Sequence, residues 1–202
     1  MDEGVSGADR REVLKVCAGA VIAGAAASSG QTTTISTSTN QPGAETEAAA
    51  SGKAGDFDFL AGEWKIKHRR MKKAHTEEWE EFEGEATCWT ILGGVGSVEE
   101  LRIPARSFSG MGLRLLDVEK RVWNDFWVNA RSGVLTTPGQ TGAFENGVGT
   151  FTADDKDGEK PIKVKGVWDR ITPNSCRWWQ TVSWDDGKTW EPNWFMDWTR
   201  AE

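Results

Sequence analysis

An alternating stretch, residues 64–70, most constrains what this chain can fold into. Side chains of one parity are Trp, Ile, His and Arg, whereas those of the other parity are Lys, Lys and Arg. Successive side chains of a strand point to opposite faces, so this period of two predicts a β-strand. The all-cationic face must be solvated, so Trp64, Ile66, His68 and Arg70 are expected to face inward. An inward face that mixes apolar and ionisable groups is more typical of a lined cavity than of a dry core.

The same periodicity continues to the C-terminus in short segments separated by turn sequences. Asn146-Gly147, between two such segments, is a strong signal for a two-residue hairpin loop. No amphipathic helix of any length is expected after Gly55. About ten strands without a long crossover predict an all-β fold, an antiparallel up-and-down barrel whose closure removes both sheet edges. The strands expected after the first are residues 77–92, 97–103, 112–117, 121–129, 143–145, 148–153, 162–171, 176–184 and 189–200.

Composition divides the chain into a leader, a linker and one domain. Residues 1–27 resemble a twin-arginine signal peptide, because Arg-Arg-Glu-Val-Leu-Lys precedes an apolar run shorter than the roughly 20 residues that span a membrane. The alternative is an N-terminal tail in which the Arg pair occurs by chance. Residues 28–54 hold too few large apolar groups to offset their ordering entropy, which predicts a disordered linker. Residues 55–202 form the predicted barrel domain, located in the periplasm or outside a bacterial cell.

Charge and cysteine content restrict the partners. A net charge of −7 and a pI of about 5.0 disfavour binding to nucleic acid and to anionic membranes, and no membrane insertion is expected after signal cleavage. Cys17 would be lost with the leader, and Cys88 and Cys176 are expected to stay unpaired because nothing in the strand order brings them together. The acidic run at 77–83 indicates a solvated strand face rather than a cation site. The sequence indicates no metal site and names no cofactor, although twin-arginine export is compatible with one.

A second motif involves the first and the last predicted strands. Gly62-Glu63-Trp64 and the C-terminal Arg200 resemble the lipocalin, or calycin, arrangement. The ordered series F-D-F-L-A-G-E-W, E-E-F-E-G, L-G-G, D-D-G-K-T-W and N-W-F-M-D-W-T-R resembles a family of uncharacterised bacterial lipocalin-like domains over residues 56–200. The resemblance implies that Trp64 lies across the barrel floor and that Arg200 covers it in a cation–π stack. It implies a fold and no activity, because the family has no agreed function.

A third motif lies near the C-terminus. Residues 183–190 match the S-x-D-x-G-x-T-W pattern known as the Asp-box, which occurs as a repeated hairpin in sialidases. It occurs once here, in a domain too short for a propeller. Asp185 and Gly187 are therefore expected to fasten a hairpin turn rather than to catalyse a reaction.

His68 and Arg70 are the leading candidates for a site. His supplies an acid or base near physiological pH, and Arg supplies a planar fork for a carboxylate or phosphate. Two cationic groups this close repel each other, which predicts a neutral His68 with a lowered pKa. The alternative is that both residues pair with acidic groups of the barrel or turn outward. Further candidates share a parity with residues expected inside: Asn129, Arg170 and Gln180 as polar groups, and Trp127, Trp168, Trp178, Trp194 and Met196 as walls. The competing interpretation is that these Trp residues fill the core and that Gln180 satisfies a Trp N–H.

Three functions follow from these candidates. The first is a binding module, in which a Trp-lined pocket holds a partly apolar small molecule that can carry an anionic group. The second is an isomerase, cyclase or hydratase that uses His68 as its acid or base and Arg70 to hold an anion. The third is a haem barrel similar to the nitrobindins, whose axial ligand is a His late in the chain. This sequence has no His after His75, which disfavours haem. Oligomeric state is not indicated.

Overall fold

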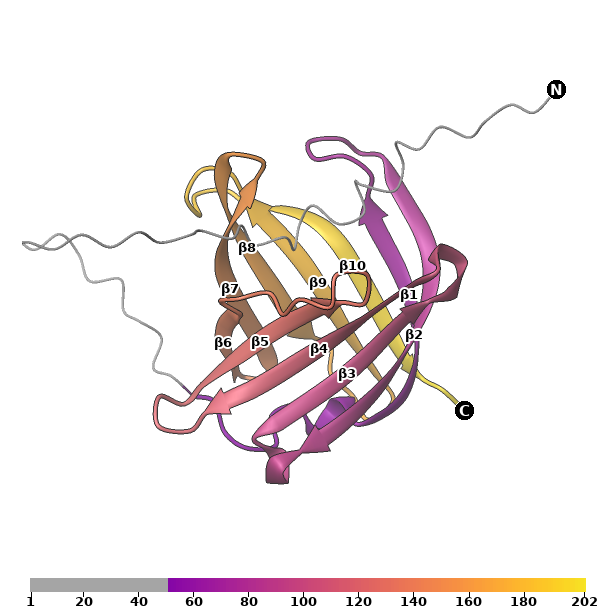
Figure 1. Cartoon of the computed structure of the whole chain (residues 1–202), viewed down its shortest axis with the longest axis vertical. Coiled ribbons are helices and arrows are strands. Elements are labelled where there is room, and N and C mark those ends of the chain that lie inside the picture. Colours follow the sequence, from indigo (N-terminus) through magenta and orange to yellow (C-terminus); the bar gives the residue numbers. More distant parts are fainter. Residues whose placement is uncertain (1–50) are drawn as a thin grey trace, which may run out of the picture. The chain divides into compact units, whose positions relative to one another are not determined.

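A computed structural model describes residues 51–202; the predicted signal peptide, residues 1–27, and most of the predicted linker, residues 28–54, lie outside the described residues. The described chain forms one closed antiparallel barrel, in which each strand pairs with its sequence neighbours and β1 pairs with β10 to close the ring (Figure 1). The strands are β1 (Gly62–Met71), β2 (Trp79–Ile91), β3 (Gly96–Ile103), β4 (Phe108–Asp117), β5 (Val122–Asn129), β6 (Gln140–Glu145), β7 (Val148–Asp157), β8 (Lys160–Asp169), β9 (Ser175–Ser183) and β10 (Glu191–Arg200). The predicted all-β, ten-stranded up-and-down barrel is confirmed.

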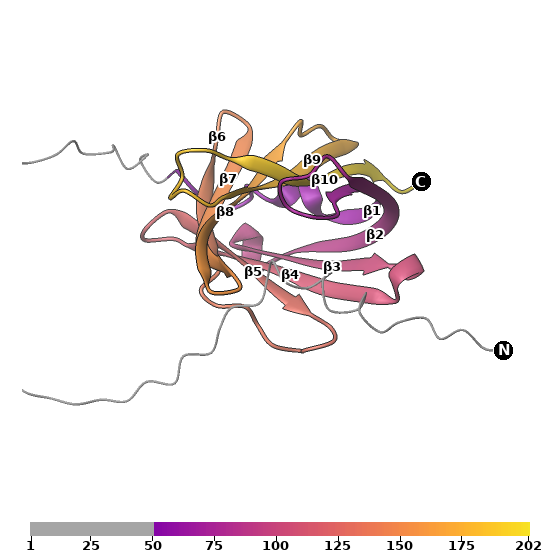
Figure 2. The ribbon, with the colours of Figure 1, turned by 90° about the horizontal axis from the view of Figure 1, so that it is seen from above.

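The only helical elements within residues 51–202 are three single turns. They are the 3-10 turns η2 (Asp58–Leu60), η3 (Leu92–Gly94) and η4 (Pro104–Arg106). None of the helices in this part of the chain has the length and apolar character needed to cross a bilayer. Viewed from above, β3 and β4 lie on the side of the ring opposite to β9 and β10 (Figure 2).

The alternation in β1 sorts its side chains as predicted. Trp64, Ile66 and His68 are 1–2% exposed and face the interior, whereas the intervening Lys and Arg side chains lie on the exposed face. The acidic residues of β2 follow the same rule, because Glu81, Glu83 and Glu85 are exposed. Period-two patterning was therefore enough to orient both strands.

One end of the barrel is sealed by aromatic side chains. The segment that carries η2 crosses this end, where it buries Phe57 and Leu60 (Figure 1, indigo). The Phe57 ring meets the rings of Trp123 and Phe144 edge to face, each at 4.9 Å between centroids. Packing begins already in the last residues of the predicted linker, because the Gly52 N–H donates to the Arg121 carbonyl over 2.8 Å. Four Trp side chains in this region are at most 1% exposed: Trp64, Trp123, Trp168 and Trp198.

The expected Trp64–Arg200 contact fastens this seal. The guanidinium carbon of Arg200 lies 4.0 Å from the centre of the Trp64 ring. Arg200 also donates to the Phe59 carbonyl over 2.8 Å and to the Ala61 carbonyl, both in the chain around η2. Gly62 is required beside it, since its φ is 121° and a Cβ there would lie 2.5 Å from Arg200 Nη1. The C-terminus of β10 thus ties down the segment that closes the barrel.

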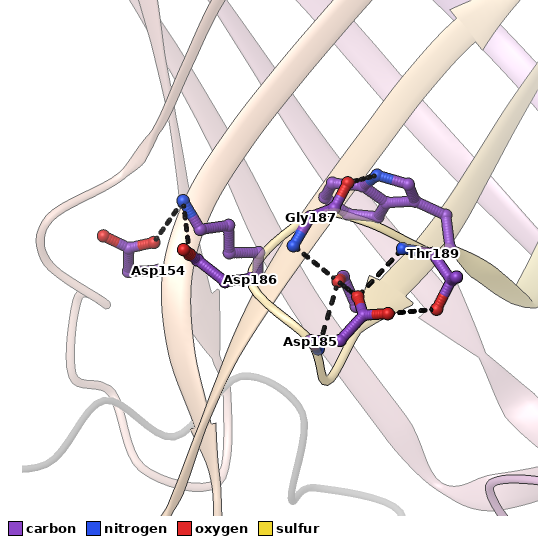
Figure 3. Close-up of polar contacts among 8 residues, drawn as sticks. Asp154, Asp185, Asp186, Gly187 and Thr189 are labelled. Atoms are coloured by element: carbon purple, nitrogen blue, oxygen red, sulfur yellow. Dashed lines mark hydrogen bonds and ion pairs between the residues drawn. The ribbon is translucent and has the colours of Figure 1, made fainter. Parts of the chain in front are cut away.

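The Asp-box hairpin joins β9 to β10 as a hydrogen-bonded turn (Figure 3). The Asp185 carboxylate accepts from the Ser183 hydroxyl over 2.8 Å and from the Thr189 backbone N–H over 2.8 Å. Hydrogen bonds from Thr189 and Ser183 lower the pKa of Asp185 to about 2. Gly187 has a φ of 87°. Among the described residues, the side-chain hydrogen bonds of Asp185 are all made with Ser183 and Thr189 of its own turn.

Cys88 and Cys176 are both free and buried, as predicted. Both thiols lie inside the barrel, in the core cluster that contains the aromatic side chains of the sealed end. Burial raises the pKa of both thiols, that of Cys176 to about 12, so both stay protonated.

Candidate functional site

His68 lies in the interior of the barrel and contacts two aromatic side chains. Its Nδ1 accepts a hydrogen bond from Trp194 Nε1 over 3.2 Å, and its ring stacks on Phe82 at 4.5 Å between centroids. Because Nδ1 accepts, the proton of the neutral imidazole is assigned to Nε2. Within residues 51–202, Nε2 is buried and has no hydrogen-bond partner. It lies over Gly84, where a Cβ would come within 2.6 Å of it.

The surroundings of His68 keep it neutral. Burial, then the charge of Arg106 and then that of Arg70, lowers the pKa of His68 to about 3. The predicted lowering is confirmed, although the sequence pointed only to Arg70. Arg106, on η4, reaches the site over the Phe82 ring at 3.6 Å and pairs with Glu80 at 2.9 Å. Arg70 lies over the Trp194 ring at 5.0 Å.

Strand pairing brings most of the predicted residues to one wall. Across β1 and β10, His68 pairs with Met196 and Arg70 with Trp194; across β10 and β9, Trp194 pairs with Gln180 and Met196 with Trp178. The two rings of Trp178 and Trp194 meet edge to face at 5.8 Å. Gln180 is buried and donates to the Asn193 side chain over 3.2 Å rather than satisfying a Trp N–H.

Four predicted residues lie elsewhere. Trp168 belongs to the sealed end, where its ring lies 5.4 Å from that of Trp198. Trp127 and Asn129 are on β5, which β6, β7 and β8 separate from β9. The inward position predicted for Arg170 is wrong. β8 ends at Asp169, and Arg170 is exposed in the following turn with a φ of 51°, so its side chain does not face the interior as that of Trp168 does.

Solvent exposure shows which end of the barrel is accessible. Trp178, Trp194, Phe82 and Arg70, which face inward beyond the sealed end, are each partly exposed. The Trp side chains of the sealed end are at most 1% exposed. The wall around His68 therefore lies between a dry aromatic floor and the end of the barrel that solvent reaches.

The structure also reveals a buried charge network that the sequence analysis missed. Arg114 Nη2 lies 2.5 Å from Glu99 Oε2, and Arg114 Nε lies 3.5 Å from Asp125 Oδ1. The side chains of Arg114 and Glu99 are 5% and 4% exposed, whereas that of Asp125 is 17% exposed. Burial raises the pKa of Asp125 to about 6, although Arg114 opposes the rise. The sequence pattern that could have indicated this network is a charged residue at an inward position on each of the three consecutive strands β3, β4 and β5.

The side chains around His68 are suited to bind a molecule that has an apolar body and a polar group. Two guanidinium groups, a neutral imidazole N–H and several indole rings suit a ring that carries an anionic group. No group of three or more His, Cys, Asp or Glu side chains that could hold a metal ion occurs among the described residues.

Comparison with known proteins adds little to this geometry. No family model matches the chain, and no curated protein matches it. Among solved structures, a protein of unknown function from the DUF3598 family of Nostoc punctiforme is similar, with a TM-score of 0.40 and 9% identity. The match covers 78% of this chain and 53% of that protein, so this chain spans about half the length of the protein it matches. At this level of similarity nothing about function transfers.

Proposed function

We propose that this protein is an exported, lipocalin-like barrel that binds a small, partly apolar, anionic molecule at the wall around His68. The observation that carries the proposal is the buried, neutral His68, whose Nε2 lacks a partner within residues 51–202 and whose neighbours are two arginines and an indole. An orphaned buried N–H costs free energy unless a ligand or water satisfies it. In the same complex, the ligand carboxylate would lie near Arg70 and an aromatic ring of the ligand would pack against Trp194.

The pKa of His68 favours binding over catalysis. General bases work best when their pKa lies near the operating pH. A pKa of about 3 leaves His68 a weak proton acceptor at neutral pH, which argues against the alternative of an enzyme that uses it as its base. The export and lipocalin-like parts of the proposal rest on the sequence motifs alone.

Trp fluorescence quenching by small aromatic acids such as benzoate tests the proposal. Arg70→Ala should weaken quenching by about tenfold or more, because a charge-assisted contact to the carboxylate is lost. Lys67→Ala is the matched control, since Lys67 carries the same charge on the exposed face of the same strand. An equal loss in both variants would mean that general surface charge attracts the acid. Absence of quenching in the unmodified protein would refute the proposed binding.

A further inference from the structure

Asp125 occupies a distinct position in the interior. Along β5 the inward-facing side chains are Trp123, which is fully buried, then Asp125, then Trp127 and Asn129, which are partly exposed. Asp125 is therefore the first of these residues above the sealed end that solvent reaches. It pairs with Arg114 on one side and with Gln140 on the other. Asp125 is the one carboxylate on β5, and a ligand entering from the end that solvent reaches would meet it just above the sealed end.

The ion network around Asp125 is unbalanced. Arg114 supplies one positive charge to two carboxylates, and its short contact is with Glu99, whereas its distance to Asp125 is 3.5 Å. Among the described residues, the side chain of Asp125 forms an ion pair with Arg114 alone. Arg114 is itself incompletely satisfied, because within residues 51–202 its buried Nε and Nη1 have no hydrogen-bond partner, and Nε contacts Asp125 only as an ion pair. A carboxylate acceptor and an orphaned guanidinium donor thus belong to one pair of side chains.

A continuous wall links this pair to His68. Gln140, the cross-strand neighbour of Asp125, and Trp178 both approach Gly166, where a Cβ would lie 2.9 Å from Gln140 Oε1 and 3.1 Å from Trp178 Nε1. Trp178 contacts Trp194, and Trp194 donates to His68. The Asp125–Arg114 pair and His68 are therefore connected through one continuous set of contacting side chains on the inner face of the barrel.

We propose that Asp125 and Arg114 form the inner anchor of the ligand site and recognise a hydroxyl group at the end of the ligand remote from its anionic group. A hydroxyl is both donor and acceptor, so it donates to Asp125 and accepts from Arg114 Nη1. The inference rests on the proposed function and narrows its ligand to hydroxylated aromatic acids.

The test compares hydroxyl with methyl at the same position of the ring. The probes are 4-hydroxybenzoate and 4-methylbenzoate, together with the longer pair 3-(4-hydroxyphenyl)propionate and 3-(4-methylphenyl)propionate, measured by isothermal titration calorimetry. In the unmodified protein the hydroxyl compound should bind about tenfold or more tightly than its methyl partner in at least one pair. Asp125→Ala should abolish this preference, and Asp125→Asn, which preserves the shape, should reduce it. Asp154→Ala is the matched control, because the Asp154 side chain is 88% exposed, and it should keep the preference.

A pH series on the unmodified protein provides an independent arm. Burial raises the pKa of Asp125 to about 6, with Arg114 from β4 opposing and Glu99 from β3 reinforcing the rise, while Gln140 from β6 carries no charge. Asp125 is therefore ionised at pH 8 and mostly protonated at pH 5, so the hydroxyl preference should fall as the pH is lowered between these values. His68 stays neutral over this range.

The outcomes separate the two proposals. If the acids bind without a hydroxyl preference in either pair, or if the preference survives Asp125→Ala, the inner anchor is wrong while the proposed function stands. If none of the four acids binds the unmodified protein, the proposed function fails and the anchor fails with it.

Discussion

Replacing Arg200 with Ala removes the clamp that holds the sealed end of the barrel. The guanidinium lies 4.0 Å from the Trp64 ring centre, and such a partly desolvated contact contributes about 1 kcal/mol. Two part-buried carbonyls, those of Phe59 and Ala61, also lose their donors, at about 1 kcal/mol each. We therefore expect Arg200→Ala to lower the free energy of unfolding by about 3 kcal/mol. For a domain of this size that corresponds to a fall of roughly 6–12 °C in melting temperature.

Urea denaturation monitored by circular dichroism measures this loss. Arg200→Lys keeps the charge and the aliphatic stem but cannot reach both carbonyls with a planar fork, so it should lose about half as much. Lys65→Ala, on the exposed face of the neighbouring strand, should change the unfolding free energy by less than about 0.5 kcal/mol. If Arg200→Ala were no more destabilising than Lys65→Ala, the clamp would contribute nothing to stability.

Two further predictions concern pH and export. The pKa of His68 is lowered from 6.5 to about 3 on folding, so its contribution to stability is present above pH 6.5 and is lost as the pH falls towards 3. The stability of the unmodified protein relative to His68→Asn should therefore drop by about 2–3 kcal/mol between pH 7 and pH 4.5 in chemical denaturation. Parallel stability curves for the two proteins would contradict the lowered pKa. For export, changing Arg10 and Arg11 to Lys in the full chain should retain the protein in the bacterial cytoplasm, as measured by cell fractionation, and unchanged export would argue against a twin-arginine signal.

Most of the fold was predictable because strand alternation and turn sequences are local features. Alternation fixes which side chains of a strand face inward, and short turns leave a meander as the simplest connection. The Asn146-Gly147 turn is an example, since both residues have positive φ and join β6 to β7 as expected. The pairing of Trp64 with Arg200 was available only through a resemblance, because no local rule links residues so far apart in the chain.

The candidate site was predictable only in part. Parity correctly placed His68 inside, and it predicted the direction of the pKa shift from the nearby Arg70. Parity failed for Arg170, because the strand ended one residue earlier and the backbone turned with a positive φ. Arg106 was missed because it lies on a turn between strands, where no periodicity orients a side chain.

By itself, the sequence determined that this chain forms antiparallel strands, which faces of them are buried, and that they close in order around an aromatic interior. Tertiary structure alone decided which buried groups meet. Glu99, Arg114 and Asp125 come from three neighbouring strands, and each has the inward parity that the sequence shows. Their contact depends on the register between strands, since a shift of one residue would turn a side chain to the opposite face. Register is set by turns and packing around the whole ring, so spacing along the chain could not reveal the network.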